Sequence, residues 1–298
     1  MKPLFLACVK GDVKVSNLHI VPDSAASLPQ EAVAGLPLSI LPMWVQAADQ
    51  SLREGIDIDS AGLYELLRRG ALPTTSQPAP GNFLDVFKPL VEQGKTIIAV
   101  LVTARASGTC ASARIAADML PAGAVTVFDS ATTAMGTGLQ ALAAAEAARA
   151  GKTLPEIMEK LVELRDGIKV HIAVPTLQHL RRSGRVSQAQ ALLAGLLNIK
   201  VVLTTENGLV VVGEKARSWQ GAINNVEARI IEAGKAGPLI VAIHHTDIPE
   251  QAQELYARLQ GKLDIAHGYV SELSASLAVH GGPGMLGAAF CSAHLFDS

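Results

Sequence analysis

Four short polar segments carry the residues whose types and positions could do chemistry. They are Asp23-Ser24, Thr74–Pro78, Ser107-Gly108-Thr109 and Asp129-Ser130. Each lies where a predicted strand gives way to a helix, and there unpaired backbone N–H groups favour an anion. Because open α/β sheets bind ligands outside the carboxyl ends of their strands, we expect these loops to converge on one crevice. The alternative is that these side chains only cap helices, which we expect of the two Asp-Ser pairs.

Two glycine patterns resemble nucleotide-binding motifs but lack the necessary context. Gly282–Gly287 reads GPGMLG, and we expect too little chain after it for the helix, second strand and acidic residue of a dinucleotide site. Gly136-Thr137-Gly138 falls inside a predicted helix, where packing explains small residues. The sequence has no GxxxxGK[ST], GxSxG or HExxH. We therefore expect no ATP site, catalytic residue, metal or cofactor, and a binding protein in place of an enzyme.

Basic residues and histidines form a second group of candidates. Arg181–Arg185 reads RRSGR, and Lys215 and Arg217 follow further along. As a bare charge run, this set is typical of a solvated face. His244-His245 ends a predicted strand and is most simply structural. His280 precedes a glycine-rich stretch that would allow close approach of a ligand or partner to the backbone.

The elements that position these residues alternate between apolar runs and helical patterns, which predicts an α/β fold. In the first half we expect strands at Leu18–Val21, Thr96–Val102 and Ala124–Phe128, and helices at Phe83–Gln93 and Thr133–Ala150. Gly94 and Gly151 stand at helix-ending positions. The less regular stretch from about 36 to 70 predicts a small insertion.

The second half predicts a mixed sheet. Asn207-Gly208 between apolar runs is a strong hairpin signal. The expected strands are Ile199–Thr204, Leu209–Val212, Leu239–Ile243, Tyr269–Leu273 and Leu286–Cys291, with helices around Trp219–Ala233 and Glu250–Leu259. We place a domain boundary near Asp166-Gly167. This gives an N-terminal α/β domain over 1–167 and a C-terminal mixed α/β domain over 168–298.

Composition excludes several partners. Hydrophobic residues make up 49% of the chain and charged residues 17%, so a large core is expected. A net charge of -2 and 4% aromatic residues argue against nucleic acid as a partner.

The cysteines and the apolar runs bear on cellular location. Cys8, Cys110 and Cys291 lie far apart, as in a reducing compartment. Too few residues precede Cys8 for a signal region, and no apolar run is long enough to span a bilayer. We expect a cytoplasmic protein.

Eight blocks of the sequence, in order, resemble the bacterial DegV family over nearly the whole chain. They are Ile20–Pro29, Leu72–Pro80, Ala106–Ala113, Val127–Gly138, Ser183–Gln190, Leu196–Lys200, Lys215–Ser218 and His280–Gly287. The resemblance implies two α/β domains, the first with a Rossmann-like parallel sheet, and a ligand tunnel between them. It also implies a fatty acid whose carboxylate is held by Thr75, Ser107 and Gly108.

The same resemblance implies a partner. Members of the family act as the binding subunit of a fatty acid kinase, in which a separate ATP-dependent subunit forms an acyl phosphate for phospholipid synthesis. Arg185, Arg217 and His280 match blocks implicated in contacting that subunit or in phosphoryl transfer. Neutral hydroxyl donors suit a carboxylate that must stay reactive, because a buried Arg would pair with it.

The chain departs from the family pattern at several positions, and other readings stay open. Pro22, Cys110, Ser183 and Val201 stand where a threonine, a tyrosine, a glycine and a proline are usual. We expect Cys110 beside the head group, where it would widen the tunnel mouth. One alternative is a stand-alone acyl hydrolase with Ser107 as nucleophile and His280 as base. Another is a regulatory or scaffold protein with a poorly formed tunnel.

Overall fold

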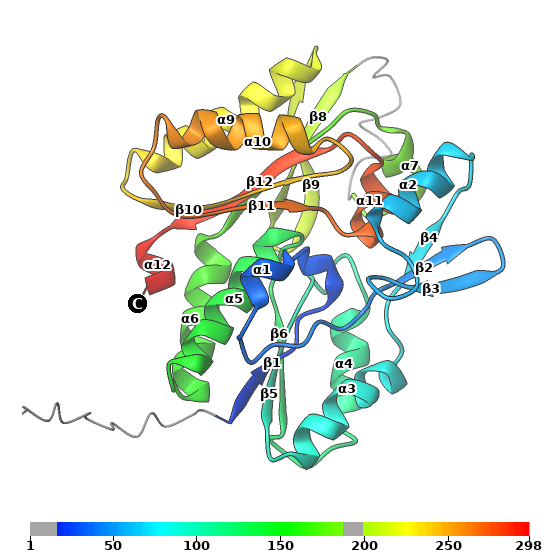
Figure 1. Ribbon diagram of the computed structural model, residues 1–298, viewed down its shortest axis with the longest axis vertical. Helices are drawn as coiled ribbons and strands as arrows, with labels where there is room; N and C mark the ends of the chain where they lie inside the picture. The colour runs from blue at the N-terminus through cyan, green and yellow to red at the C-terminus, as the bar shows by residue number, and fades with distance from the viewer. Residues whose placement is uncertain (1–16, 187–198, 298) are drawn as a thin grey trace, which may run out of the picture.

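The computed structural model describes residues 17–186 and 199–297. Its first half is built on a parallel sheet of β1 (Leu18–Ile20), β5 (Thr96–Leu101) and β6 (Val125–Asp129), in the order β1-β5-β6 (Figure 1). The three predicted strands are confirmed to within one or two residues at each end. Cys8 and parts of the Ser183–Gln190 and Leu196–Lys200 blocks lie outside the described residues.

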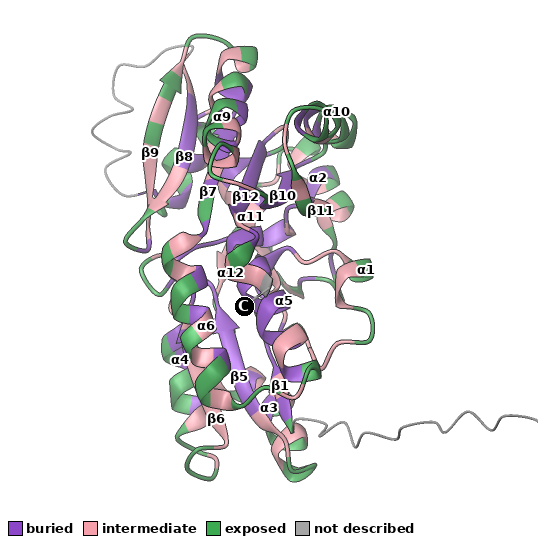
Figure 2. Cartoon of the chain, turned by 90° about the vertical axis from the view of Figure 1, so that its left-hand side faces the viewer, coloured by how far each residue is buried: buried purple, intermediate pink, exposed green. Residues whose placement is uncertain are grey.

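Helices cover both faces of this sheet. On one face lie α3 (Pro80–Glu92), which packs against β5 through two buried phenylalanines, and α4 (Thr109–Ala117), which packs through small buried side chains. On the other face lie α5 (Met135–Arg149) and α6 (Leu154–Gly167). β5 is therefore buried on both sides, as its continuous apolar run requires, while the outer helix faces stay exposed (Figure 2). Gly94 and Gly151 have φ of 76° and 83°, which confirms them as helix-ending residues.

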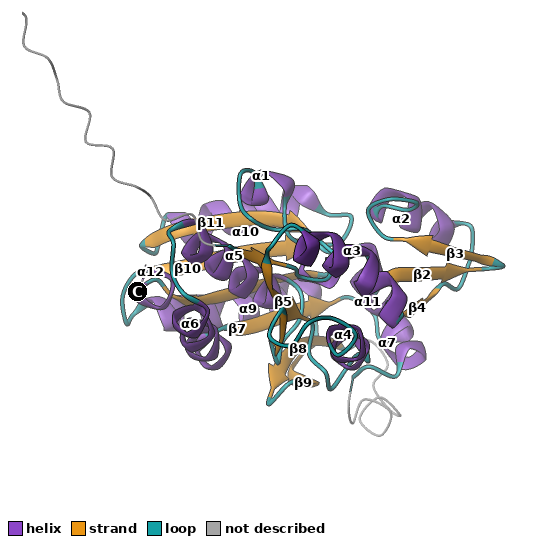
Figure 3. Ribbon diagram, turned by 90° about the horizontal axis from the view of Figure 1, so that it is seen from below, coloured by secondary structure: helices purple, strands orange, loops and turns teal. Residues whose placement is uncertain are grey.

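A small antiparallel sheet projects from the first half (Figure 3). After η1 (Ser24–Ala26) and α1 (Gln30–Val33), the chain forms β2 (Trp44–Ala47), β3 (Gln50–Arg53) and α2 (Ser60–Arg68). β4 (Thr74–Ser76) completes the sheet in the order β3-β2-β4. β4 lies beyond the predicted insertion at about 36–70, whose bounds stay a prediction.

The second half is a six-stranded mixed sheet in the order β11-β10-β12-β7-β8-β9. Its strands are β7 (Lys169–Val174), β8 (Lys200–Glu206), β9 (Leu209–Ala216), β10 (Leu239–His245), β11 (Ile265–Glu272) and β12 (Leu286–Ser292). Only the β10–β11 pair is parallel. Asn207 and Gly208 have φ of 49° and 80°, as a two-residue hairpin turn requires, so the predicted hairpin is confirmed. The sequence analysis did not predict β7.

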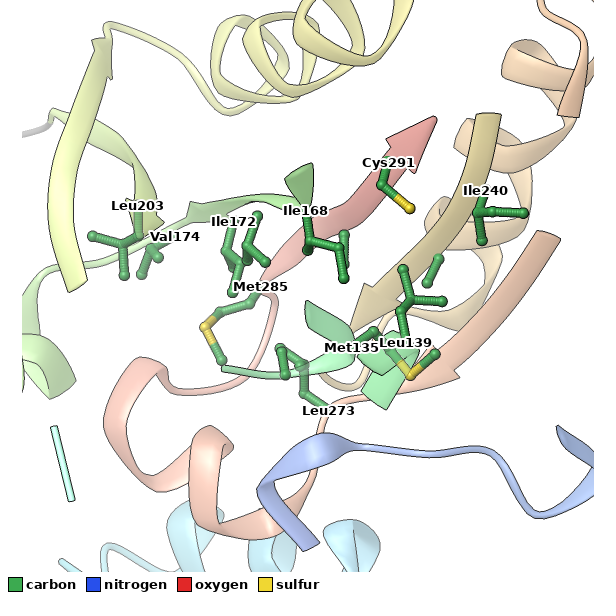
Figure 4. Close-up of a cluster of buried hydrophobic side chains, with 14 of the residues drawn as sticks. Met135, Leu139, Ile168, Ile172, Val174, Leu203, Ile240, Leu273, Met285 and Cys291 are labelled. Atoms are coloured by element: carbon green, nitrogen blue, oxygen red, sulfur yellow. The ribbon is translucent and has the colours of Figure 1, made fainter. Parts of the chain in front are cut away.

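The two halves share one core. One face of the mixed sheet is covered by α9 (Trp219–Gly234) and α10 (Pro249–Gln260). The other face packs on Met135 and Leu139 of α5, so side chains from both halves meet in a single cluster (Figure 4). Two short helices, α7 (Gln178–Ser183) and α11 (Ala275–Gly281), border this face, and α12 (His294–Asp297) ends the described chain. The division into domains at residue 167 stays a prediction.

Packing also explains the glycines of α5. A Cβ atom on Gly136 would lie 2.6 Å from Cγ2 of Val170, and one on Gly138 would lie 2.6 Å from the carbonyl oxygen of Ala26. This confirms that the glycines allow close packing inside a helix. No helix within residues 17–186 and 199–297 is long and apolar enough to cross a membrane.

Candidate functional site

A cavity lies between the small sheet, α11 and the mixed sheet, and it holds about 1050 Å³ of atom-free space including its open mouth. Most of its wall is apolar. The apolar wall is formed by Ala25, Met43, Val170, Ile172, Leu180, Leu203, Val210, Leu273, Leu277 and Met285. The cavity is therefore suited to an extended apolar group.

Thr75 and His280 meet in the wall of this cavity. Thr75 lies on β4, where it pairs with Val45 of β2, and His280 lies near the end of α11. Oγ1 of Thr75 and Nε2 of His280 are 2.8 Å apart and form a hydrogen bond. The small sheet and the last helix before β12 thus contribute one polar pair.

Ser107 and Gly108 reach the same cavity from the loop between β5 and α4. The Ser107 and Thr109 hydroxyl oxygens are 2.6 Å apart, and the Thr109 backbone N–H donates to Ser107 Oγ at 3.3 Å. Gly108 is the N-cap of α4, and a Cβ there would lie 2.9 Å from Nε2 of Gln77. Glycine at this position therefore lets the Gln77 side chain lie against the loop. The predicted head-group residues all line one cavity.

His280 is neutral at neutral pH. Burial lowers its pKa to about 4, and the positive charge of Arg185 acts in the same direction. Nδ1 of His280 is buried and has no hydrogen-bond partner within the described residues. The polar part of the cavity beside Thr75 therefore offers a neutral ring and hydroxyl groups.

The three predicted partner residues do not gather at one place. Arg185 is exposed but lines the cavity with His280, and its guanidinium donates to the carbonyl oxygen of Ser183 at 2.6 Å. A neighbouring hollow of about 570 Å³ shares Ser183, Arg185 and His280 with the cavity. Arg217 is exposed after β9 and does not line the cavity. Its neighbour Ala216 pairs with Lys200, at the opposite end of the hairpin from its turn.

Asp23 is a helix cap, as expected, whereas Asp129 is not, because α5 has Ala134 at its N-cap and no side-chain hydrogen bond there. Asp23 caps η1, accepting from the N–H groups of Ala25 at 3.0 Å and Val102 at 2.8 Å. Asp129 accepts from the N–H of Ala131 at 2.9 Å. Asp23 is fully buried, and burial raises its pKa to about 7. Both side chains serve the backbone of the loops that carry the site.

Glu54 is a buried carboxylate behind the cavity wall that the sequence analysis missed. It accepts from the backbone N–H of Ser276 at 2.7 Å, the Ser276 hydroxyl at 2.9 Å and the Ser24 hydroxyl. No lysine, arginine or histidine pairs with it in the described ranges. Glu54 therefore ties η1 and the start of α11 to the small sheet. In the sequence it sits in an irregular Glu-Gly segment that resembles an exposed turn.

One expectation about a neighbouring residue was wrong. Cys110 does not lie beside the head group: its thiol is buried in the core of the parallel sheet, 3.6 Å from the carbonyl oxygen of Val102. Of the glycines after His280, Gly281 lines the cavity, and both Gly281 and Gly282 also lie close to side chains of the chain itself. A Cβ on Gly281 would lie 2.0 Å from Sδ of Met285, and one on Gly282 would lie 2.4 Å from Cδ2 of His179. These glycines pack the end of α11 against its surroundings.

The geometry disfavours hydrolase chemistry. A nucleophilic serine needs a base within hydrogen-bonding reach and a third group that orients the base. Ser107 bonds to Thr109, whereas His280 bonds to Thr75. No acidic side chain contacts Nδ1 of His280 among the described residues. Within the same ranges, no three His, Cys, Asp or Glu side chains gather closely enough to hold a metal ion.

The fold and the cavity define an α/β protein with a parallel sheet, a mixed sheet and a small antiparallel sheet, and with an apolar-walled site that carries neutral hydrogen-bonding groups. Residues 17–293 match the model of the DegV family, described as uncharacterised, and the chain belongs to this family. Protein DegV of Bacillus subtilis is 32% identical over 278 residues, covering 92% of this chain and 99% of that protein. A DegV domain-containing protein of Streptomyces coelicolor is 35% identical and covers 91% of this chain and 97% of its own.

Solved structures of relatives have the same fold. The crystal structure of Bacillus subtilis DegV, described as a fatty acid binding protein, superposes with a TM-score of 0.85 at 31% identity, covering 93% of this chain and 99% of that one. A DegV family protein from Thermus thermophilus, described by its fatty acid binding, has a TM-score of 0.82 at 30% identity and covers 92% and 99%. The predicted α/β architecture with a parallel and a mixed sheet is confirmed.

Proposed function

We propose that this protein binds one long-chain fatty acid, with the carboxylate at Thr75, Ser107 and Gly108 and the tail along the apolar wall. The observation that carries the proposal is a single cavity, apolar over most of its wall, into which two hydroxyls and a neutral histidine project from three separate elements. Relatives of known structure are described as fatty acid binding proteins, which supports the same ligand class.

The balance of contacts favours an acyl ligand. Each buried methylene contributes about 0.8 kcal/mol, so a chain of about sixteen contributes up to about 13 kcal/mol before the costs of association. The head group then needs few hydrogen bonds. When His280 carries its proton on Nε2, the ring donates to Thr75, and the Thr75 hydroxyl hydrogen is free to reach the carboxylate.

We further propose that the bound acid is presented to a separate ATP-dependent fatty acid kinase subunit, which forms the acyl phosphate used in phospholipid synthesis in the cytoplasm. Neutral donors leave the carboxylate oxygen nucleophilic. Arg185 lines the cavity with His280, which supports a contact with a phosphate, and the exposure of Arg217 supports a contact with the partner surface.

Ligand binding is tested first. We expect native mass spectrometry of the purified protein to find about one long-chain fatty acid per chain. After delipidation, Thr75→Val and Ser107→Ala should each weaken fatty acid affinity by about 1–3 kcal/mol, because a charged acceptor loses a donor. Thr74→Val is the matched control, since Thr74 is exposed on the same strand and does not line the cavity. Equal affinity of the native protein for an acid and its methyl ester would contradict head-group recognition.

Presentation to a kinase needs a second assay on the same samples. Arg185→Ala and Arg217→Ala should retain fatty acid affinity while losing most acyl phosphate formation with the kinase subunit, ATP and ligand. Arg149→Ala, at the exposed end of α5, is the control for loss of a surface charge. Parallel loss of affinity and turnover would point to damage of the acyl site, and full turnover in both variants would remove the arginines from the proposal.

A further inference from the structure

The turn of the β8–β9 hairpin lies against the loop that carries Ser107. The hydroxyl of Thr103, which precedes Ser107 in that loop, donates to the carbonyl oxygen of Gly208 at 2.7 Å. Gly208 has a φ of 80°, and a Cβ there would lie 2.9 Å from Oγ1 of Thr103 and 3.2 Å from Cδ of Arg105. A larger residue in the turn would therefore disturb this contact.

Thr103 also holds the backbone of the Ser107 loop. Its carbonyl oxygen accepts from the backbone N–H groups of Ala106 at 3.1 Å and Ser107 at 3.2 Å. Its hydroxyl oxygen accepts from the N–H of Arg105 at 3.3 Å, and its own N–H donates to the carbonyl oxygen of Thr132 at 2.9 Å. Thr103 is fully buried and does not line the cavity. It can therefore act on a ligand only through its neighbours.

The same end of the hairpin contacts two other parts of the cavity wall. Thr205 of β8 pairs with Val210 of β9, and Val210 bridges to Val186, which follows Arg185. The hydroxyl oxygens of Thr205 and Thr132 are 3.3 Å apart. The hairpin end thus lies beside the head-group loops and joins them to the segment that carries Arg185.

These bonds form a chain of contacts from the hairpin turn to the head-group site. The bond to the Gly208 carbonyl fixes the position of Thr103, and the Thr103 carbonyl holds the N–H of Ser107, which lines the cavity. A binding group must be held within about 0.5 Å of its productive position by the residues behind it. Loss of the Thr103 hydroxyl would leave the Gly208 carbonyl without this donor and would free the Ser107 loop to shift.

We propose that Thr103 is a positioning residue for fatty acid recognition, which sets the Ser107-Gly108 loop against the turn of the β8–β9 hairpin so that the loop can hold the carboxylate. The inference rests on the proposed fatty acid function and adds a residue that does not touch the ligand. Because Leu203 of β8 and Val210 of β9 belong to the apolar wall, the same hairpin places the tail and the head group relative to each other.

The test measures the affinity of delipidated protein for hexadecanoic acid and for its methyl ester, by competition with a fluorescent fatty acid. Thr103→Val keeps the shape of the side chain but removes the hydroxyl. We expect it to lower the preference for the acid over the ester by about five- to tenfold, the range of one net hydrogen bond. The affinity for the ester should stay within about twofold of the native value. Thr103→Ser, which keeps the hydroxyl, should retain the native preference.

Two further variants separate this role from a general loss of packing. Thr137→Val removes an equally buried hydroxyl, which bonds to Ser130 at 2.9 Å, from a residue that does not line the cavity, and it should keep the native preference. Gly208→Ala disturbs the contact from the hairpin side and should lower the preference as Thr103→Val does. Added to Thr103→Val, it should change the preference by less than about twofold, because the contact is already lost.

The outcomes distinguish this inference from the function on which it rests. A native preference in Thr103→Val, an equal loss of acid and ester affinity, or the same loss of preference in Thr137→Val overturns the positioning role alone. If Thr103→Val does not fold, Gly208→Ala decides by the same criterion. Failure of the native protein to bind the acid, or to prefer it over the ester, overturns the proposed head-group recognition as well.

Discussion

Removal of the Glu54 carboxylate should destabilise the protein and loosen the wall that carries His280. The side chain is 6% exposed, and its oxygens accept from the Ser276 backbone N–H, the Ser276 hydroxyl and the Ser24 hydroxyl. In Glu54→Ala these donors lose their acceptor, at about 1–3 kcal/mol each. Glu54 has no cationic partner among the residues that the structure describes, so release of its buried carboxylate offsets several kcal/mol of this loss. We therefore expect a net destabilisation of about 2–4 kcal/mol.

Urea unfolding at pH 7 measures this change through the midpoint at constant m-value. Glu54→Gln should lose only about 1 kcal/mol, because the amide oxygen still accepts from Ser276 and its NH₂ can donate to a hydroxyl. Glu92→Ala, an exposed acid on α3, should stay within about 0.5 kcal/mol of the native protein. A Glu54→Ala protein as stable as the native one would refute the reasoning. If α11 is held in place by Glu54, this variant should also discriminate less between an acid and its methyl ester.

Two further perturbations follow from buried groups. Gly136→Ala should lower the free energy of unfolding by about 1–3 kcal/mol, because the new Cβ would lie 2.6 Å from Val170 and 2.7 Å from Thr132. The change is measured by the urea midpoint, and Gly81→Ala, which has open space at its Cβ, is the control. Burial lowers the pKa of His244 to about 3. As the pH falls below about 6.5, His244 therefore becomes protonated in the unfolded chain but stays neutral in the folded protein. Its stabilising contribution is complete above pH 6.5 and is lost as the pH falls towards 3. The fall in stability between pH 7 and 5 should therefore be smaller in His244→Leu, by up to about 1.4 kcal/mol per pH unit, and an unchanged slope would contradict this.

Local sequence signals predicted the turns and helix ends that depend on only a few neighbouring residues. Asn207-Gly208 adopts the left-handed turn that such a pair favours, and Gly94 and Gly151 end their helices with positive φ. Strand β7 was missed for a different reason. Its run Lys169–Val174 contains His171, which interrupts the apolar pattern, and the imidazole packs against the ring of Phe290 at 5.8 Å on the neighbouring strand. That contact depends on β12, far along the chain, so no window of sequence around β7 reveals it.

The candidate site was predictable only where family blocks named its residues. Thr75, Ser107, Gly108, Arg185 and His280 all line one cavity. Whether a side chain faces the cavity or the core depends on how its helix packs. Cys110 follows Thr109 in the same block, yet its thiol points into the core of the parallel sheet. Glu54 could not be recognised for the same reason, because only the folded chain shows which polar groups are buried.

The hydrogen bond between Thr75 and His280 joins residues 205 positions apart. A growing polypeptide therefore carries most of its acyl cavity walls long before it carries both members of this pair. Until α11 emerges and packs on β4, the apolar wall has no completed head-group site and cannot select an acid from other apolar molecules. Under the proposed function, ligand loading is therefore an event of the finished chain, and chains shortened before residue 280 should expose apolar surface without gaining the ability to hold a fatty acid.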